Sequence, residues 1–224
     1  MKKKGRTILI ILASLVVVYY IASATGMLST AVFSPGSNEP NVRSGSRIWV
    51  SNLVKPKRFD FICYKMDKSE YWEGGTWMMR LCGMPHDTIQ IIDGALFVNG
   101  RDADAPLNLK KEYSLSKEES KKLDKAYFRN SDDIHVLADS SVYASLETDV
   151  YKKKALHGAL IIDSSTSGIE SVFHQPWSRD NFGPIVVPDS MFFVLGDNRH
   201  GAADSRYTGF IDKKRWKGTV ISIF

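Results

Sequence analysis

The chain begins with its longest apolar stretch. A basic tip, Lys2–Lys4 and Arg6, precedes an apolar run from Thr7 to Leu28, and no charged residue occurs between Arg6 and Glu39. About 20 apolar residues suffice to cross the hydrocarbon core of a bilayer as a helix. Positive charges mark the cytoplasmic end of such a span. We therefore expect residues 1–28 to form a cytoplasmic basic tip and one transmembrane anchor, with the main domain on the extracytoplasmic side of the plasma membrane.

A cleaved signal peptide is the alternative interpretation of the same stretch. Ala22-Ser23-Ala24 has the small residues of a cleavage site. The apolar run continues past this site, which favours a retained, single-pass anchor.

Short strand-like segments follow and predict an all-β core. Residues 29–45 are rich in Ser, Pro, Gly and Asn, which predicts a linker and an exposed loop. Beyond them, residues 47–54, 59–64 and 76–82 are rich in β-branched and aromatic residues or alternate with polar ones, as strands do. Asp93-Gly94 separates two further such segments and is a strong hairpin signal.

The character of the sequence changes at about residue 103. Ser116 and Glu119 have the spacing of a capping box, and the charged run that follows suits a short exposed helix. Residues 134–137 and 159–162 favour strands, while residues 140–154 are ambiguous.

These patterns together predict a mostly β fold, with one transmembrane helix followed by a β core that holds an inserted α+β subdomain. The core is expected to consist of residues 29–102 and 186–224. The inserted subdomain is expected to occupy residues 103–185.

Composition and charge restrict the class of partner. The chain has 224 residues, 43% of them hydrophobic and 25% charged, which is typical of a folded protein. The net charge is +5, but no basic stripe is interleaved with aromatic residues, so we expect no nucleic-acid partner. Attraction to anionic lipid headgroups is the more natural use of the surplus charge.

Two cysteines, Cys63 and Cys82, cannot build a disulfide framework, and their spacing fits no metal motif. Two buried thiols are expected, and one bridge between neighbouring strands is the alternative if the domain lies outside the cytosol. We expect no metal and no cofactor.

The densest group of chemically capable side chains lies near the C-terminus. Residues 196–206 read GDNRHGAADSR and follow an apolar strand pattern. Charges so close to a core strand usually pair with one another or frame a site, because an unpaired buried charge is costly.

This segment resembles the most specific motif of the type I signal peptidases. Three further blocks resemble that family in the same order and spacing: Pro35–Pro40, Gly45–Val50 and Met79–Asp87. The resemblance implies a membrane-anchored serine endopeptidase that removes signal peptides from exported pre-proteins. It also implies a mostly β catalytic domain with a Ser/Lys dyad.

The resemblance places Ser37 at the nucleophile and Met79 at the family's lysine base. A serine hydroxyl is a poor nucleophile until a base takes its proton, and a thioether does not accept that proton at neutral pH. Ala202 stands where the family has a serine that orients the lysine, and Pro35 stands where many members carry an oxyanion-donating serine. The departures predict a protein that is inactive or severely impaired.

The remaining site positions are expected to support the fold of the site. Asp197, Arg199, Asp204 and Arg206 are interpreted as an ion-pair network beneath the site, with Arg80 and Asn198 as further supporting positions. His200 could replace the missing base, with Asp204 as its orienter, although a solvated loop histidine is commoner. His86 and Lys65 are expected at the surface. Trp72 and Trp77 suit either a lip that dips into the bilayer or a packed core.

Two functions therefore remain open. The first is a signal peptidase that cuts after small residues at the membrane surface. The second is a non-catalytic, pseudo-peptidase protein that binds signal peptides or assists an active paralogue. The first, with activity lost or severely impaired, is the expectation, and the residues at positions 79 and 202 discriminate between the two.

Overall fold

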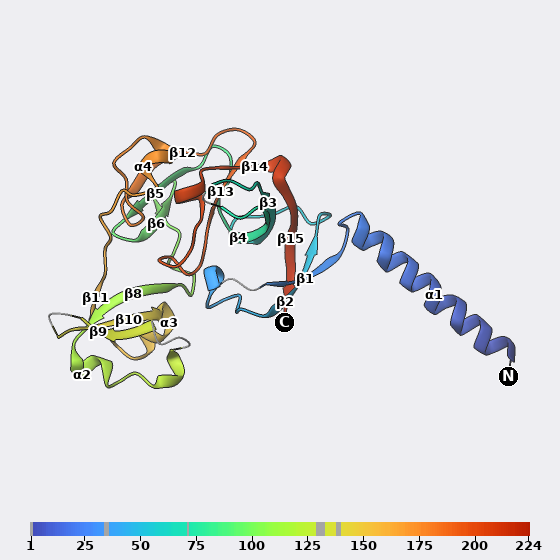
Figure 1. Cartoon of the computed structure of the whole chain (residues 1–224), viewed down its shortest axis with the longest axis horizontal. Coiled ribbons are helices and arrows are strands. Elements are labelled where there is room, and N and C mark those ends of the chain that lie inside the picture. Colours follow the sequence, from blue (N-terminus) through green and yellow to red (C-terminus); the bar gives the residue numbers. More distant parts are fainter. Residues whose placement is uncertain (1, 34–35, 71, 129–132, 138–139) are drawn as a thin grey trace.

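A computed structural model describes residues 2–33, 36–70, 72–128, 133–137 and 140–224. Three β-sheets and one long N-terminal helix dominate the fold (Figure 1). The mostly β class predicted from the sequence is confirmed.

Helix α1 (Lys2–Ala24) projects away from the sheets, with its N-terminal end farthest from them (Figure 1). Its 21 residues from Lys4 to Ala24 are long and apolar enough to cross a membrane, and none of the apolar window is buried against the protein. The C-terminal end of α1 is attached to the domain by Asn52. The Asn52 side chain donates to the carbonyl of Thr25 at 2.9 Å, and its backbone N–H donates to the carbonyl of Gly26 at 3.0 Å. These bonds satisfy carbonyls that a helix end leaves without partners.

The largest sheet carries the N- and C-terminal parts of the core. It has seven strands in the order β1-β2-β15-β3-β4-β13-β14. Their bounds are β1 (Ser29–Phe33), β2 (Ser46–Ser51), β15 (Trp216–Ile223), β3 (Phe61–Met66), β4 (Gly75–Gly83), β13 (Met191–Leu195) and β14 (Ile211–Asp212). Three short helical turns accompany it: η1 (Gly36–Asn38), α5 (Ser205–Thr208) and η4 (Lys213–Arg215).

Strand β1 corrects the expectation of loop throughout residues 29–45. Ser29–Phe33 pair antiparallel with β2, in a register that sets Ala31 opposite Ile48. The strand lies at the sheet edge, and three of its five residues are exposed. Its sequence therefore lacks the alternation of buried and exposed residues that identifies a strand.

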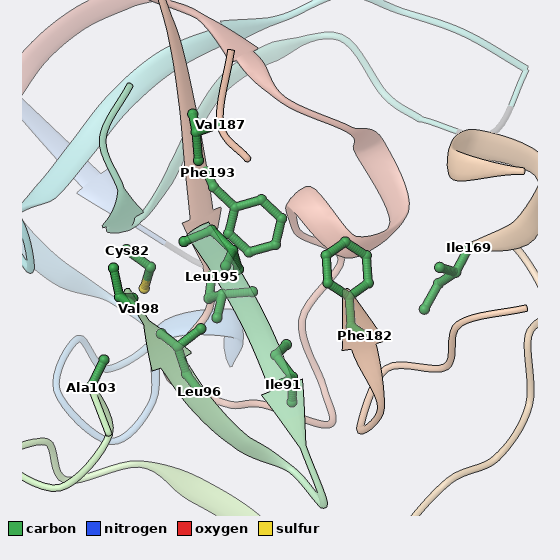
Figure 2. Close-up of a cluster of buried hydrophobic side chains, with 11 residues drawn as sticks. Cys82, Ile91, Leu96, Val98, Ala103, Ile169, Phe182, Val187, Phe193 and Leu195 are labelled. Carbon is green, nitrogen blue, oxygen red and sulfur yellow. The ribbon is translucent and has the colours of Figure 1, made fainter. Parts of the chain in front are cut away.

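A second sheet packs against the first and encloses the main core. Its order is β12-β5-β6-β7, and the bounds are β12 (Phe182–Val186), β5 (Thr88–Ile92), β6 (Ala95–Val98) and β7 (Arg101–Asp102). Asp93 and Gly94 both have positive φ in the β5–β6 turn, as the sequence predicts for this hairpin. Figure 2 shows the apolar cluster between the sheets, where Leu96 and Ile91 lie near Leu195 and Phe193. Helix α4 (Glu170–Phe173) and the preceding Ile169 cover one side of this cluster.

A third sheet, also of four strands, has an apolar cluster of its own (Figure 1). Its order is β11-β8-β10-β9, and the bounds are β11 (Ala159–Leu160), β8 (Lys110–Leu115), β10 (Val142–Glu147) and β9 (Ile134–Val136). Helix α2 (Lys117–Ser120), with its predicted Ser116–Glu119 capping box, η2 (Lys125–Tyr127) and α3 (Thr148–Lys153) complete it. By strand pairing this unit runs from β8 to β11. The later segment with β12, inside the stretch 103–185 that the sequence suggested as an insert, pairs with β5 of the core.

The two cysteines do not form a bridge. Cys63 and Cys82 are both free and buried. They lie on neighbouring strands, but Cys63 is opposite Met78 in the register, so Cys82 is displaced by four residues along β4. The two thiols belong to different apolar clusters, which matches the expectation of two buried hydrophobic side chains.

Candidate active site and its ion-pair frame

Ser37 lies in the short turn η1 and is half-buried. The segment after β13 holds this turn through the backbone. The Asn198 N–H donates to the Ser37 carbonyl at 3.0 Å, and the Asn198 side chain donates to the Gly36 carbonyl at 3.2 Å. Gly196 passes so close that a Cβ there would lie 2.5 Å from the Ser37 carbonyl oxygen. Glycine is needed at this position because the two backbones are in contact.

Asn38 fixes the same turn from the other side. Its fully buried side chain donates to the carbonyl of Met78 at 2.7 Å, which ties the turn to β4. Pro35, the other notable residue of this block, lies outside the described residues. A Ser/Asn/Gly loop offers no signal that one of its amides is buried, so the role of Asn38 could not be predicted from the sequence.

Ser37 and Met79 line one cavity of about 540 Å³. Residues of β1, β2, β3 and β4 line the cavity, and Ala203 borders it from the C-terminal segment. Met79 is 4% exposed and packs in an apolar cluster with Ile62 and Leu81. The structure therefore brings together the two positions that the sequence proposes as nucleophile and base.

The cavity lining contains a single ionisable side chain among the described residues, that of Cys63. Burial raises the pKa of the Cys63 thiol to about 12, so this group keeps its own proton at physiological pH and offers no thiolate to accept another. The Ser37 hydroxyl makes no side-chain hydrogen bond within the described part of the chain. No group in the described lining is thus suited to take its proton.

Arg80 and Asp197 form the first part of the predicted ion-pair network. Arg80 donates from Nε and Nη2 to the two carboxylate oxygens of Asp197, each at 2.6 Å, and from Nη1 to the Phe59 carbonyl at 2.6 Å. The side chain of Asn41 donates to the same carboxylate at 2.7 Å. Asp197 is fully buried, so this fork joins the segment after Ser37, strand β4 and the segment after β13.

Arg199 and Arg206 each have a separate carboxylate. Arg199 pairs with Asp104 through both terminal nitrogens, and Arg206 pairs with Asp204 at 2.8 Å. Burial disfavours the guanidinium charge, but Asp104 outweighs it and raises the pKa of Arg199. Asp104 lies outside the four motif blocks, which is why the sequence analysis missed it.

The third sheet supports the segment around Asn198 directly. The Lys110 N–H donates to the Asp197 carbonyl at 2.9 Å, and the Arg199 N–H donates to the Lys110 carbonyl at 3.0 Å. Strand β8 therefore fixes the backbone on both sides of Asn198.

His200 is placed elsewhere than its suggested role as a base would need. Its side chain is almost fully buried between Asp180 and Glu112, with Nε2 at 3.1 Å from Asp180 and Nδ1 at 3.3 Å from Glu112. The Glu112 backbone N–H also donates to Nδ1 at 3.1 Å, so Nδ1 is an acceptor in the neutral ring. In the charged ring Nδ1 carries a proton and faces the Glu112 carboxylate. His200 is not part of the cavity beside Ser37, and Asp204, its suggested orienter, is bound to Arg206.

The pKa of His200 reflects this position. Burial disfavours the charged ring, but the hydrogen bonds and charges of Asp180 and Glu112 outweigh it and raise the pKa of His200. The same contacts lower the pKa values of Asp180 and Glu112 against the effect of their own burial. The three side chains form a buried polar bridge between the third sheet and the core.

The structure also places the other residues that the sequence singled out. Ala202 is buried against Gly196, where a Cβ on the glycine would overlap it. Trp77 packs on the Met79 cluster and stands edge-on to Trp72. Lys65 is exposed, and exposed His86 lies 2.9 Å from Asp189. Among the described residues, no three His, Cys, Asp or Glu side chains gather as metal ligands do.

Comparison with known proteins decides the family. The family model described as signal peptidase, peptidase S26, matches residues 5–224. The chain belongs to this family. Its helix α1 agrees with the membrane anchor of signal peptidase I.

Individual members of the family share low sequence identity with this chain. It is 28% identical over 158 residues to signal peptidase I of Buchnera aphidicola subsp. Acyrthosiphon pisum (strain APS), a match that covers 66% of this chain and about half (48%) of that protein. It is 25% identical over 193 residues to signal peptidase I of Bacillus licheniformis, covering 84% of this chain and 72% of that one. A crystal structure of a signal peptidase I from Enterococcus faecalis V583 matches with 22% identity and a TM-score of 0.35, over 74% of this chain and 97% of that chain.

Proposed function

We propose that this chain binds signal peptides of exported pre-proteins in the cavity beside Ser37 and cleaves them slowly or not at all. Family membership supports the substrate class, because signal peptidases act on signal peptides. The single observation that carries the second half is the composition of the cavity lining. Cys63, with its raised pKa, is the one ionisable side chain among its described residues.

The chemistry follows from where the Ser37 proton would go. In a Ser/Lys dyad, a neutral amine accepts the hydroxyl proton while the oxygen attacks the peptide carbonyl. Here the Met79 thioether occupies that position and cannot accept it. General-base assistance is worth about 10²–10⁴ in rate, so Ser37 alone is expected to give very slow turnover.

Binding does not need the missing base. The turn that carries Ser37, strand β4 and the C-terminal segment are held together by the Arg80–Asp197 fork and by Asn38. The cavity between them remains open at about 540 Å³. An extended peptide with small side chains suits such a cleft.

The site is proposed to face the extracytoplasmic side of the plasma membrane. The apolar helix α1 is long enough to cross the bilayer, and basic residues before it favour a cytoplasmic N-terminus. The bilayer and an active paralogue are the further partners in this proposal. An active paralogue would cut the signal peptides that this chain holds.

The test compares binding with cleavage in the full-length chain. A labelled signal peptide ending in Ala-x-Ala is titrated against the detergent-solubilised protein by fluorescence anisotropy, and the same mixture is examined for cleavage by mass spectrometry. We expect saturable binding, little cleavage, and no change of affinity in Ser37→Ala. Rapid cleavage that disappears in Ser37→Ala would refute the loss of catalysis, and absence of binding would refute the substrate class.

A further inference from the structure

Lys110 is a buried lysine whose side chain has no part in the proposed peptide binding described so far. It is the first residue of β8 in the third sheet, and its side chain is 9% exposed. Lysine is rarely buried unless its ammonium group is paired. The partners of Lys110 therefore show which parts of the fold its charge holds together.

The ammonium group of Lys110 contacts two carboxylates that are far apart in the sequence. Its Nζ lies 2.8 Å from Asp133, which precedes β9 of the same sheet, and 3.6 Å from Glu39. Both carboxylates are about as buried as the lysine, with side chains 10% and 11% exposed. Glu39 follows Ser37 by two residues, and its N–H donates to the Gly36 carbonyl at 3.2 Å, so it belongs to the same turn. The Lys110 side chain thus ties the third sheet to the Ser37 turn.

The backbone of Lys110 reaches the same turn by a second route. Its N–H and its carbonyl bond to the backbone on the two sides of Asn198. Asn198 in turn donates to the carbonyls of Gly36 and Ser37. One residue of β8 therefore supports the turn directly through Glu39 and indirectly through Asn198.

Loss of the ammonium group would change the position of the turn. The carboxylates of Glu39 and Asp133 would then share a buried space without the cation between them, and like charges repel strongly where little water screens them. Glu39 would relieve this repulsion by moving toward water, and Ser37 would move with it, because the two residues share one short turn. Since Ser37 lines the cavity, the shape of the peptide site would change.

We propose that Lys110 is a positioning residue, which pairs with Glu39 and thereby holds the Ser37 turn in the shape that binds a peptide. The inference rests on the proposed peptide binding and gives the third sheet a part in it. Lys110 itself does not line the cavity, so it acts on a bound peptide through the turn and not by contact.

The test measures peptide affinity and urea unfolding of the full-length protein in parallel. We expect Lys110→Met, which keeps a long side chain without its charge, to weaken binding of the labelled Ala-x-Ala peptide about ten-fold. Lys110→Arg keeps a cation between the two carboxylates and should bind within about three-fold of the unmodified chain.

Lys111→Met is the matched control. Lys111 is the next residue of β8 and is equally buried, and its Nζ lies 2.7 Å from the Gly94 carbonyl and 3.3 Å from Asp104. These partners lie in the β5–β6 turn and after β7, not in the Ser37 turn. This variant should lose stability as Lys110→Met does, while its peptide affinity stays within about two-fold of the unmodified chain.

Glu39→Gln tests the route and covers the case that Lys110→Met does not fold. It removes the charge on the turn and leaves Lys110 paired with Asp133, so it should weaken binding about three-fold. Because Lys110 acts through Glu39, adding Lys110→Met to Glu39→Gln should cause no further loss of affinity.

Several outcomes would overturn the positioning role while leaving peptide binding intact. They are unchanged affinity in Lys110→Met or in Glu39→Gln, equal losses of affinity in Lys110→Met and Lys111→Met, and additive losses in the double variant. A folded Lys110→Arg that binds as weakly as Lys110→Met would also overturn it, because the charge would then not be what holds the turn. Failure of the unmodified chain to bind the peptide would overturn the proposed function itself, and the positioning role with it.

Discussion

Replacing Met79 by lysine should restore a base and cost stability at the same time. The Met79 side chain is 4% exposed and packs against Ile62 and Leu81, so an amine at its end would be largely desolvated. Full burial lowers a lysine pKa by about 3–5 units. Since the side chain also borders the open Ser37 cavity, we take about 3 units, which brings the pKa from about 10.4 to about 7.4.

One shifted pKa then governs two observables. A lysine pKa lowered by folding destabilises the native state by about 1.4 kcal/mol per unit, or about 4 kcal/mol at pH 7 and below. The cost shrinks as the pH rises through the folded pKa toward the unfolded one, and is about 2 kcal/mol at pH 9. The neutral amine that accepts the Ser37 proton accumulates over the same range. Cleavage should therefore rise between pH 7 and 8 while the stability deficit falls.

The assay uses Met79→Lys/Ala202→Ser, because a hydroxyl at position 202 restores the orienting group implied by the family resemblance. Cleavage of a pre-protein and urea unfolding are both measured from pH 6 to 10. Met79→Leu is the matched control, since it keeps an apolar side chain and should gain no activity. A folded, peptide-binding double variant that cleaves no faster than the parent at any pH would refute the reasoning. So would cleavage by the parent at the rate of the variant.

Three further predictions concern the frame of the site. Asp197→Ala should destabilise the fold by about 3–5 kcal/mol in urea unfolding, because it leaves Arg80 buried and uncompensated, and a double replacement of the pair by apolar residues should cost less. The urea midpoint of the parent should fall as the pH rises, and His200→Gln should remove this dependence. Because folding raises the pKa of His200, the charged ring stabilises the fold fully below about pH 6.5, and this stabilisation is lost as the pH rises through the folded pKa. A parent with constant stability from pH 6 to 9 would contradict the assignment. Gly196→Ala should weaken peptide binding in the anisotropy assay because its Cβ would press on the Ser37 carbonyl; unchanged affinity would show that the turn is not held there.

The regular elements could be predicted where β-branched and aromatic residues are dense or where a turn or cap signal is present. The β5–β6 hairpin, the capping box of α2 and the strands β2, β3 and β4 lie within a few residues of the sequence-based expectation. Strand β1 could not be predicted, because edge position leaves its residues exposed on both faces. The pairing of β12 with β5 is likewise a long-range contact, between Phe182 and Ile91, that no local pattern encodes.

The sequence identified residues of the candidate site but not which residues each of them contacts. The motif blocks identified Arg80, Asp197, Asp204 and Arg206, and all four lie in buried ion pairs. The sequence offered Asp204 as the partner of His200, because it is near in the chain. In the structure His200 instead contacts Glu112 and Asp180, which are 88 and 20 positions away in the sequence.

The search for a proton acceptor beside Ser37 needed three dimensions most. The sequence shows that position 79 is a methionine, but a base for Ser37 could come from any segment that the fold brings to the cavity. Strands β1, β3 and β4 do converge there, and the ionisable side chain they supply among the described lining residues is the Cys63 thiol, whose pKa burial raises to about 12. The same fold retains the Arg80–Asp197 fork and the Asn38 contact, which hold the Ser37 turn in place. A cavity held in place by these contacts, with no proton acceptor among its described lining residues, fits the proposed binding of a peptide better than its hydrolysis.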